Sequence, residues 1–338
     1  MSRRLLLSVF VIAAACGQPP EQQALTDVKA FIQTNLDALA TDAQAVCDAA
    51  PVAAGRGWNA TTDAAAITAM KTAWKKARPD YEKVEGAIAV LFPEIDVSID
   101  ERYDGFLESE SDVDLFDDEV VTGNHAIERI LWSDETPQRV IDFEQGLGAK
   151  YVAARFPNTE AESRDFKEKL CARWAKETKQ MATDFKPLAL DPAAAFRGVL
   201  GSMQEQVEKV EKATTGEEES RYSQFTLADM RANLEGGKKT YEAFRPWALS
   251  KGATDEDTRI TKAFAELSAQ YAATPGDAIP PVPATWSNTN PSAADLATPF
   301  GTLFTVVRTA ADDMTSGTLA FDMTAAADKM GIPQLPAE

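Results

Sequence analysis

The sequence predicts an all-α protein built from two helical-bundle halves. Apolar residues recur at intervals of three and four along most of the chain, strand patterns are nearly absent, and Pro, Gly, Asn and Asp cluster between the periodic segments. At 338 residues the chain exceeds the usual size of one domain. We therefore expect an N-terminal bundle over residues 25–187 and a C-terminal bundle over residues 188–338. The expected helices cover residues 23–49, 62–92, 120–133, 136–154, 159–185, 196–215, 226–246, 254–272 and 293–330.

The first residues are typical of an export signal. Two arginines precede an apolar segment, Leu5–Ala15, which is too short to span a membrane stably. The three alanines before Cys16 resemble a bacterial lipobox, so we expect a signal peptide over residues 1–15 and a lipid on Cys16, followed by a tether over residues 16–24. The alternative is an ordinary signal peptide with an incidental cysteine. The sequence thus predicts an exported protein, a periplasmic or cell-surface lipoprotein held on a membrane through Cys16.

Two further cysteines lie in the body of the chain. If Cys16 carries a lipid, Cys47 and Cys171 remain in a compartment that permits disulfides. A bridge between them and a pair of buried free thiols are both compatible with the sequence, because spacing does not give the Cα distance that a bridge requires.

An internal repeat supports the two halves. Met70–Glu82 and Met230–Glu242 align without gaps and match at Met, Tyr and Glu. The two segments are offset by 160 residues, so a second copy of His125 and Glu128 would lie near residue 285. The sequence has no such copy there. A single metal site would therefore belong to the first half. Within the first of these segments, Pro79 should kink the helix.

Two segments lack the helical pattern. Residues 94–119 carry twelve Asp and Glu against one basic residue, Arg102, and we expect a solvated acidic loop there. Residues 273–292 hold no apolar period and predict a long connection. The net charge of −19 argues against binding to nucleic acid and favours the attraction of cations.

The most informative residue is the only histidine, His125. It lies in the run GNHAIERILW with Glu128 three positions later, and residues at that spacing share one face of a helix. An imidazole and a carboxylate so placed could ligate a metal, although a lone histidine without a ligand role is an equally common outcome. Because the chain has one histidine, neither an H-E-x-x-H zinc site nor a three-histidine site can form. Any metal must be held mostly by carboxylates.

These residues resemble a known family. The segment over residues 77–102, followed by TGNHAIERILW, is similar to the imelysin-like family of bacterial exported proteins, and most similar to the M-domain of the EfeO and EfeM iron-uptake lipoproteins. The family motif Gly-x-His-x-x-Glu is matched by Gly123, His125 and Glu128, while Asn124 stands where an aromatic residue is usual. The resemblance extends over residues 25–335 and implies an imelysin-like all-α fold.

The resemblance also implies a ligand set. It makes His125, Glu128, Glu85 and Asp100 the metal ligands, with Glu82 as the alternative to Glu85. Arg78 and Arg102 would brace the carboxylates. One imidazole with three carboxylates suits iron, manganese, calcium or zinc. The resemblance favours iron, with zinc or calcium as the alternatives.

The function implied is an envelope-anchored lipoprotein that captures or delivers iron, together with a membrane iron permease or another envelope partner, and we expect a monomer. One alternative is an imelysin-type metallopeptidase, as the traditional family name implies, which would need an open coordination position and a general base such as Glu82. Others are a module that binds an envelope polymer through a metal, and a structural protein in which His125 only forms hydrogen bonds. No catalytic residue is assigned.

Overall fold

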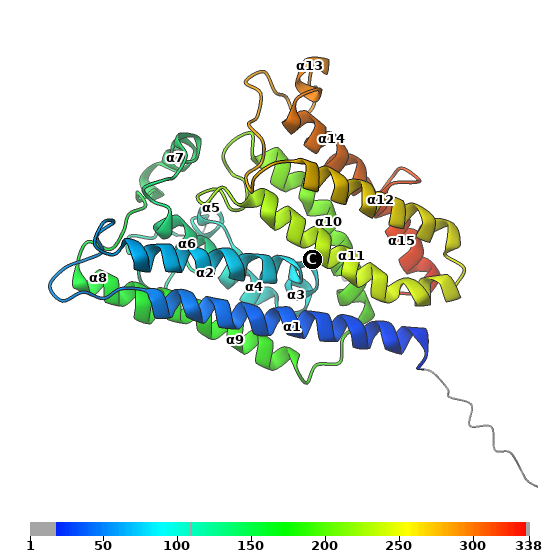
Figure 1. The fold of residues 1–338 in the computed structure, drawn as a ribbon, viewed down its shortest axis with the longest axis horizontal. Helices are drawn as coiled ribbons and strands as arrows, with labels where there is room; N and C mark the ends of the chain where they lie inside the picture. Colours follow the sequence, from blue (N-terminus) through cyan, green and yellow to red (C-terminus); the bar gives the residue numbers. More distant parts are fainter. Residues whose placement is uncertain (1–17, 109, 336–338) are drawn as a thin grey trace, which may run out of the picture.

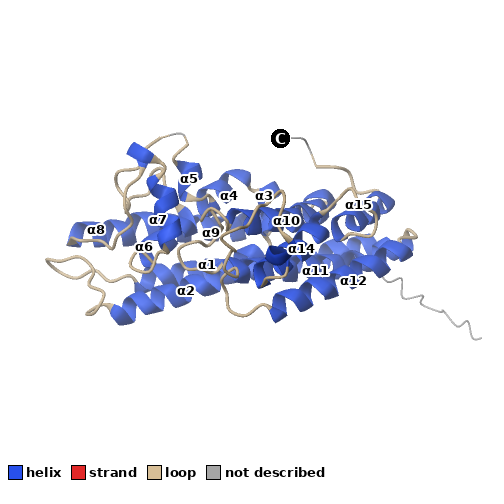
Figure 2. Ribbon diagram, turned by 90° about the horizontal axis from the view of Figure 1, so that it is seen from above, coloured by secondary structure: helices blue, strands red, loops and turns tan. Residues whose placement is uncertain are grey.

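The structure, a computed structural model, describes residues 18–335 except residue 109. The expected signal peptide and Cys16 lie outside the described residues. Within them the chain forms helices and no strand, as Figure 2 shows, apart from an isolated bridge between Ala53 and Arg56. The prediction of an all-α fold is confirmed.

The first group of helices covers the N-terminal part of the chain. In Figure 1 the long α1 runs along the lower edge of the molecule, with α2 above it and α9 beside it. Its elements are α1 (Pro20–Ala49), α2 (Ala64–Glu82), α3 (Glu85–Leu91), α4 (Pro93–Asp100), α5 (Tyr103–Phe106), α6 (Gly123–Leu131), α7 (Gln138–Gln145), α8 (Glu160–Asp165), a π-helical turn (Phe166–Cys171) and α9 (Ala172–Phe185).

The second group follows from residue 192. Its central helices, α10 and α11, pack on the first group and carry the remaining helices on their outer side (Figure 1). These elements are α10 (Pro192–Lys212), α11 (Thr226–Ser250), α12 (Thr254–Ala273), α13 (Ala293–Leu296), α14 (Pro299–Ala311) and α15 (Leu319–Met330). The connection expected over residues 273–292 is present between α12 and α13.

Several helix boundaries differ from the sequence-based expectation. Helix α1 begins at Pro20, inside the expected tether, because proline suits the first position of a helix. The segment over residues 136–154 keeps its helix only to Gln145 and then turns through Gly148, whose φ is +65°. The expected helix over 293–330 is three helices, and Thr298 caps the second of them by accepting a hydrogen bond from a backbone N–H.

Two further differences affect the site. The acidic segment contains two short helices, α4 and α5, where a loop was expected. The single helix expected over 62–92 is interrupted at Lys83 and Val84, a few residues after Pro79, so that α2 ends at Glu82 and α3 begins at Glu85. Both differences determine the positions of Glu82, Glu85 and Asp100 in the site.

A disulfide joins Cys47 to Cys171, whose Cα atoms are 5.5 Å apart. The bridge connects the last turn of α1 to the π-helical turn before α9, across 124 positions of sequence. The first of the two alternatives left open by the sequence is therefore the one found.

Close glycine contacts join the two groups of helices. A Cβ on Gly198 of α10 would lie 2.0 Å from the carbonyl oxygen of Gly86 in α3, and a Cβ on Gly236 of α11 would lie 2.0 Å from the carbonyl oxygen of Lys83. Only residues without a side chain allow the backbones to approach this closely. The start of α3 is thereby held directly against α10 and α11.

Candidate metal centre

The centre is organised by the start of α6. Gly123, the first residue of this helix, has a φ of +79°, and a Cβ there would lie 2.4 Å from the carbonyl oxygen of Ile99. The positive φ and the absence of a side chain let α6 begin against the end of α4. His125 and Asp100 are thereby brought together, which gives a physical reason for the glycine in the motif.

Asn124 fixes the position of Asp100. Its amide nitrogen donates hydrogen bonds to the carbonyl oxygen of Ile99, at 2.7 Å, and to Oδ1 of Asp100, at 2.6 Å. The indole N–H of Trp74 donates to the carbonyl oxygen of Asn124 at 3.0 Å. The side-chain amide of Asn124 thus holds the Asp100 carboxylate in place.

Glu128 contacts the first nitrogen of the histidine. His125 is 1% exposed, and its Nδ1 lies 2.9 Å from Oε2 of Glu128. The other oxygen of Glu128 accepts hydrogen bonds from the backbone N–H groups of Tyr222 and Ser223, at 3.1 and 2.7 Å, and from the Ser223 hydroxyl at 2.7 Å. Both oxygens of Glu128 are occupied, so this residue orients the imidazole.

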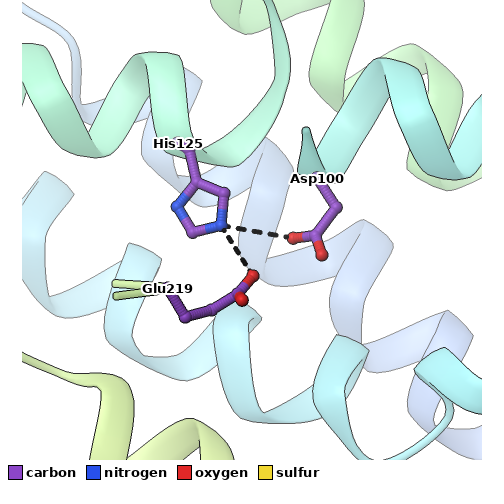
Figure 3. A group of neighbouring side chains, drawn as sticks. All are labelled: Asp100, His125 and Glu219. Carbon is purple, nitrogen blue, oxygen red and sulfur yellow. Dashed lines mark hydrogen bonds and ion pairs between the residues drawn. The ribbon is translucent and has the colours of Figure 1, made fainter. Parts of the chain in front are cut away.

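The second nitrogen faces two other carboxylates. Nε2 of His125 lies 3.2 Å from Oε1 of Glu219 and 3.6 Å from Oδ1 of Asp100, as Figure 3 shows. The three side chains offer ligand atoms that all lie within 4.8 Å of one another. One nitrogen and two oxygens at this spacing can hold a metal ion of intermediate or hard character.

A second group of carboxylates adjoins the first. Glu82, Glu85 and Asp100 also offer oxygens within 4.8 Å of one another, and Asp100 belongs to both groups. Glu82 ends α2, Glu85 begins α3 and Asp100 ends α4, so the ends of these three helices bring three acidic side chains together.

Two buried cations lie among these carboxylates. The guanidinium of Arg78 pairs with Glu82 and Asp100 and, at 2.9 Å, with Glu219. Nζ of Lys209, on α10, lies 3.0 Å from Glu82, 3.5 Å from Glu85 and 3.7 Å from Glu219. Buried carboxylates need such partners, because an isolated buried charge is very costly.

A cavity of about 250 Å³ gives access to this cluster. Its wall contains Glu85, Asp100 and Glu219 from the groups above, and the acidic residues that line it would attract cations. Arg102 lies at the wall, 3.6 Å from Glu219, as a weak brace. The remaining wall residues are Asp96, Val97, Glu101, Glu205, Glu208 and Lys209.

The environment shifts several pKa values. Burial and Arg78 both favour the neutral imidazole. The hydrogen bonds that the imidazole donates to Glu128 and Glu219, together with the charge of Asp100, outweigh them and raise the pKa of His125 to about 9. Burial raises the pKa of Glu85 to about 8, against the lowering effect of Lys209. Burial and the Asp100 charge raise the pKa of Asp96, on the cavity wall, to about 7.

The structure brings most of the predicted site residues to one place. His125, Asp100, Glu85, Glu82 and Arg78 meet in one buried cluster, and Arg102 lies at its edge. Glu128 reaches the opposite nitrogen of His125 from the one that faces the other carboxylates.

Two residues of the cluster were not predicted. Glu219 lies in the connection between α10 and α11, and Lys209 lies on α10, so the second group of helices contributes to a cluster expected in the first half alone. The only sequence signal for Glu219 is a run of three glutamates, Glu217–Glu219, in the connection between two helices.

The fold and the cluster define a class: helical proteins with a buried His and carboxylate centre in which a glycine, a histidine and a glutamate follow the spacing Gly-x-His-x-x-Glu. The chain belongs to the imelysin family, which it matches over residues 24–299. Among the described residues, no helix is both long and apolar enough to cross a membrane.

Curated relatives share part of this chain. It is 27% identical over 223 residues to the iron uptake system component EfeO of Escherichia coli K12, and equally to that of Shigella flexneri. The alignment covers 66% of this chain and 46% of each relative. The chain therefore spans about half the length of the curated relatives it matches.

Proposed function

We propose that this protein binds a metal ion, with iron as the preferred cargo, at His125, Asp100 and Glu219, and hands it to an iron uptake system of the cell envelope. The observation that carries the proposal is the asymmetric use of the imidazole. Nδ1 is held by Glu128, while Nε2 faces the oxygens of Asp100 and Glu219 at 3.6 and 3.2 Å. A histidine that donates from one nitrogen to a carboxylate and offers the other to a metal is the usual arrangement at metal centres.

The carboxylates around the ion complete the donor set. Glu85 and Glu82 share the second group with Asp100, so either one can approach an ion bound to Asp100. In this proposal Glu85 is the nearer supplement, because it lines the cavity and Glu82 does not. Glu128 takes the role of the residue that orients His125, and Arg78 that of the brace for the carboxylates.

The donor chemistry disfavours calcium, and the relatives favour iron among the remaining ions. Oxygen donors with one imidazole suit Fe, Mn and Zn, whereas calcium prefers six to eight oxygens and no nitrogen. We favour iron because the relatives that match the chain are components of an iron uptake system. Zinc remains the main competitor in the test.

The cellular setting belongs to the same proposal. An export signal and a lipid on Cys16 would place the body of the protein outside the cytoplasm on a membrane, in the periplasm or at the cell surface. A membrane iron permease or another envelope protein would then receive the ion, with this chain acting as a monomer.

Metal binding by the purified protein tests the proposal. We expect about one ion per chain by elemental analysis, and binding of Fe²⁺ under anaerobic conditions by calorimetry, with Mn²⁺, Zn²⁺ and Ca²⁺ for comparison. His125→Ala should weaken binding by more than about 100-fold, because it removes the only nitrogen ligand. Asp142→Ala, which removes an acidic residue of the separate helix α7, is the control and should leave binding unchanged.

The opposite result is equally clear. A folded wild-type protein that binds none of these ions would overturn the proposal, and so would a His125→Ala variant that binds as the wild type does.

A further inference from the structure

The ammonium group of Lys209 lies among carboxylates that could bind a metal ion. Its side chain is 4% exposed, and Nζ is surrounded by oxygens of Glu82, Glu85 and Glu219 at 3.0, 3.5 and 3.7 Å. Glu82 and Glu85 belong to one of the two carboxylate groups that could hold a metal, and Glu219 belongs to the other. A lysine thus stands in direct contact with both groups.

Lys209 differs from Arg78, the other buried cation of the cluster, because it borders the cavity. Arg78 is paired with Glu82, Asp100 and Glu219 and also lies 3.5 Å from Asp229, and it is not part of the cavity wall. Lys209 does form part of that wall. Its long, flexible stem gives the ammonium a path into the cavity.

A place for the displaced ammonium exists on the same helix. Glu205, one turn before Lys209 on α10, also lines the cavity. Residues four apart on a helix are neighbours, so an ion pair between Glu205 and Lys209 can form on the cavity side. The ammonium would keep a carboxylate partner after leaving the cluster.

A metal and the ammonium would share the negative charge of one carboxylate, Glu219, from its two oxygens. Glu219 uses Oε1 toward His125 and Oε2 toward Lys209. A divalent ion bound at His125 would lie within a few ångströms of the ammonium, and like charges repel strongly in a buried site. The arrangement therefore opposes tight binding as long as the ammonium stays in place.

We propose that Lys209 is a tethered cation that neutralises the carboxylates of the metal-free protein, competes with the incoming metal, and moves into the cavity toward Glu205 when the metal binds. The inference rests on the proposed function, since it concerns the same metal site. It gives Lys209 the role of a positioning residue that lowers affinity, which suits a protein that must release its cargo. It also ties metal binding to α10 of the second group of helices.

Calorimetry with Mn²⁺ tests the competition. Lys209→Met removes the ammonium and keeps most of the stem, and we expect it to bind Mn²⁺ about tenfold or more tightly than the wild type, because the repulsion is gone. Lys212→Met is the matched control. Lys212 lies one turn further on α10, pairs with Glu208 and does not contact either carboxylate group, so its removal should leave affinity nearly unchanged. Affinity of Lys209→Met equal to or weaker than that of the wild type would overturn the inference.

A measurement on the wild-type protein covers the case in which Lys209→Met does not fold. Reductive methylation followed by mass spectrometry reports how fast each lysine amine reacts. We expect Lys209 to react slowly without metal and several-fold faster with saturating Mn²⁺, while Lys212 reacts alike in both. An unchanged or slower reaction of Lys209 with Mn²⁺ would contradict the proposed movement.

The result also distinguishes the two proposals. If the wild type binds no metal, the proposed function fails. If the wild type binds Mn²⁺ and His125→Ala does not, while Lys209→Met matches the wild type, the function stands and the role of Lys209 alone is refuted.

Discussion

At the scale of single residues, the centre depends on the two different nitrogens of one imidazole. The spacing of His125 and Glu128 correctly places both on one helical face, but spacing does not tell which nitrogen a carboxylate meets. The structure shows that Glu128 meets Nδ1 and that Nε2 is turned to Asp100 and Glu219. Two residues predicted as equals thus have different environments.

The first prediction concerns Glu128. Glu128→Gln keeps the shape but removes the charge that stabilises the Nδ1 proton, so we expect metal affinity to fall by about 10- to 100-fold without being abolished. Calorimetry with Mn²⁺ measures the change, and Glu135→Gln, an exposed residue after α6, serves as the control. A loss as large as that of His125→Ala would instead mean that Glu128 is itself a ligand.

The second prediction concerns pH. Since the pKa of His125 is raised to about 9, the metal-free protein holds a proton on Nε2 at pH 7 that an incoming metal must displace. Glu85, with its pKa raised to about 8, acts in the same direction. Affinity should therefore rise with pH between about 6.5 and 9, by about tenfold or more per unit.

The stability of the metal-free protein should change with pH in the opposite direction to its metal affinity. The folded pKa of His125 lies above its unfolded value of 6.5, so its stabilising effect is complete below pH 6.5 and is lost as the pH rises toward 9. In the metal-free protein, the free energy of unfolding should fall over this pH interval. His125→Gln should remove the contribution of His125 to this pH dependence. Calorimetry in buffers of different ionisation enthalpy counts the released protons; a flat pH profile of affinity would contradict the shift.

His125, Asp100, Glu85 and Arg78 were predicted because each lies within or near a run that resembles a family motif. The prediction missed Glu219 and Lys209, which lie 94 and 84 positions after His125. Neither residue interrupts a pattern, since an acidic turn and a charged residue on an amphipathic helix are both ordinary. Only the packing of distant helices shows that these two side chains are buried.

At the scale of helices, Pro79 predicted a kink, but local sequence did not predict that α2 would continue to Glu82 and break from α3 there. No glycine or proline lies at Lys83 or Val84, and tertiary contacts stabilise the break. Asn233 of α11 donates hydrogen bonds to the carbonyl oxygen of Glu82 and to a carboxylate oxygen of Glu85, both at 2.7 Å. A carbonyl left unpaired by the end of α2 is thereby satisfied by a distant helix.

The third prediction tests how α6 is placed. Gly123→Ala adds a Cβ against the backbone of Ile99 and strains a φ of +79°, so we expect a loss of stability of about 1–3 kcal/mol and weaker metal binding. Gly148→Ala is the matched control, because its φ is +65° but the space around it is open. It should show the cost of the positive φ without the effect on metal. Thermal unfolding measures the stability of both variants, and calorimetry measures their metal affinity. Equal metal affinity in the two would refute the role of Gly123 in placing α6 for metal binding.

At the scale of the whole molecule, the cluster lies where the two groups of helices meet. Sequence patterns predicted two halves and assigned the metal residues to the first, since the internal repeat carries no second copy of the motif. The structure places Glu219 and Lys209 of the second group in the same cluster. A charged cluster shared between two helical groups depends on how closely their backbones approach, and this in turn depends on glycines.

The fourth prediction tests that approach. Gly198→Ala would place a Cβ 2.0 Å from the backbone oxygen of Gly86, so α3 and α10 must separate. We expect stability to fall by about 1–3 kcal/mol, and metal affinity to fall with it, because Glu219 follows α10 in the chain while Asp100 and His125 belong to the first group. Gly201→Ala, on the same helix with open space around it, should be neutral or stabilising by up to about 1 kcal/mol, since alanine favours helices. If Gly198→Ala matched Gly201→Ala in both unfolding and metal titration, the glycine contact would have no part in joining the two groups; a loss of stability with unchanged metal affinity would show that the cluster tolerates their separation.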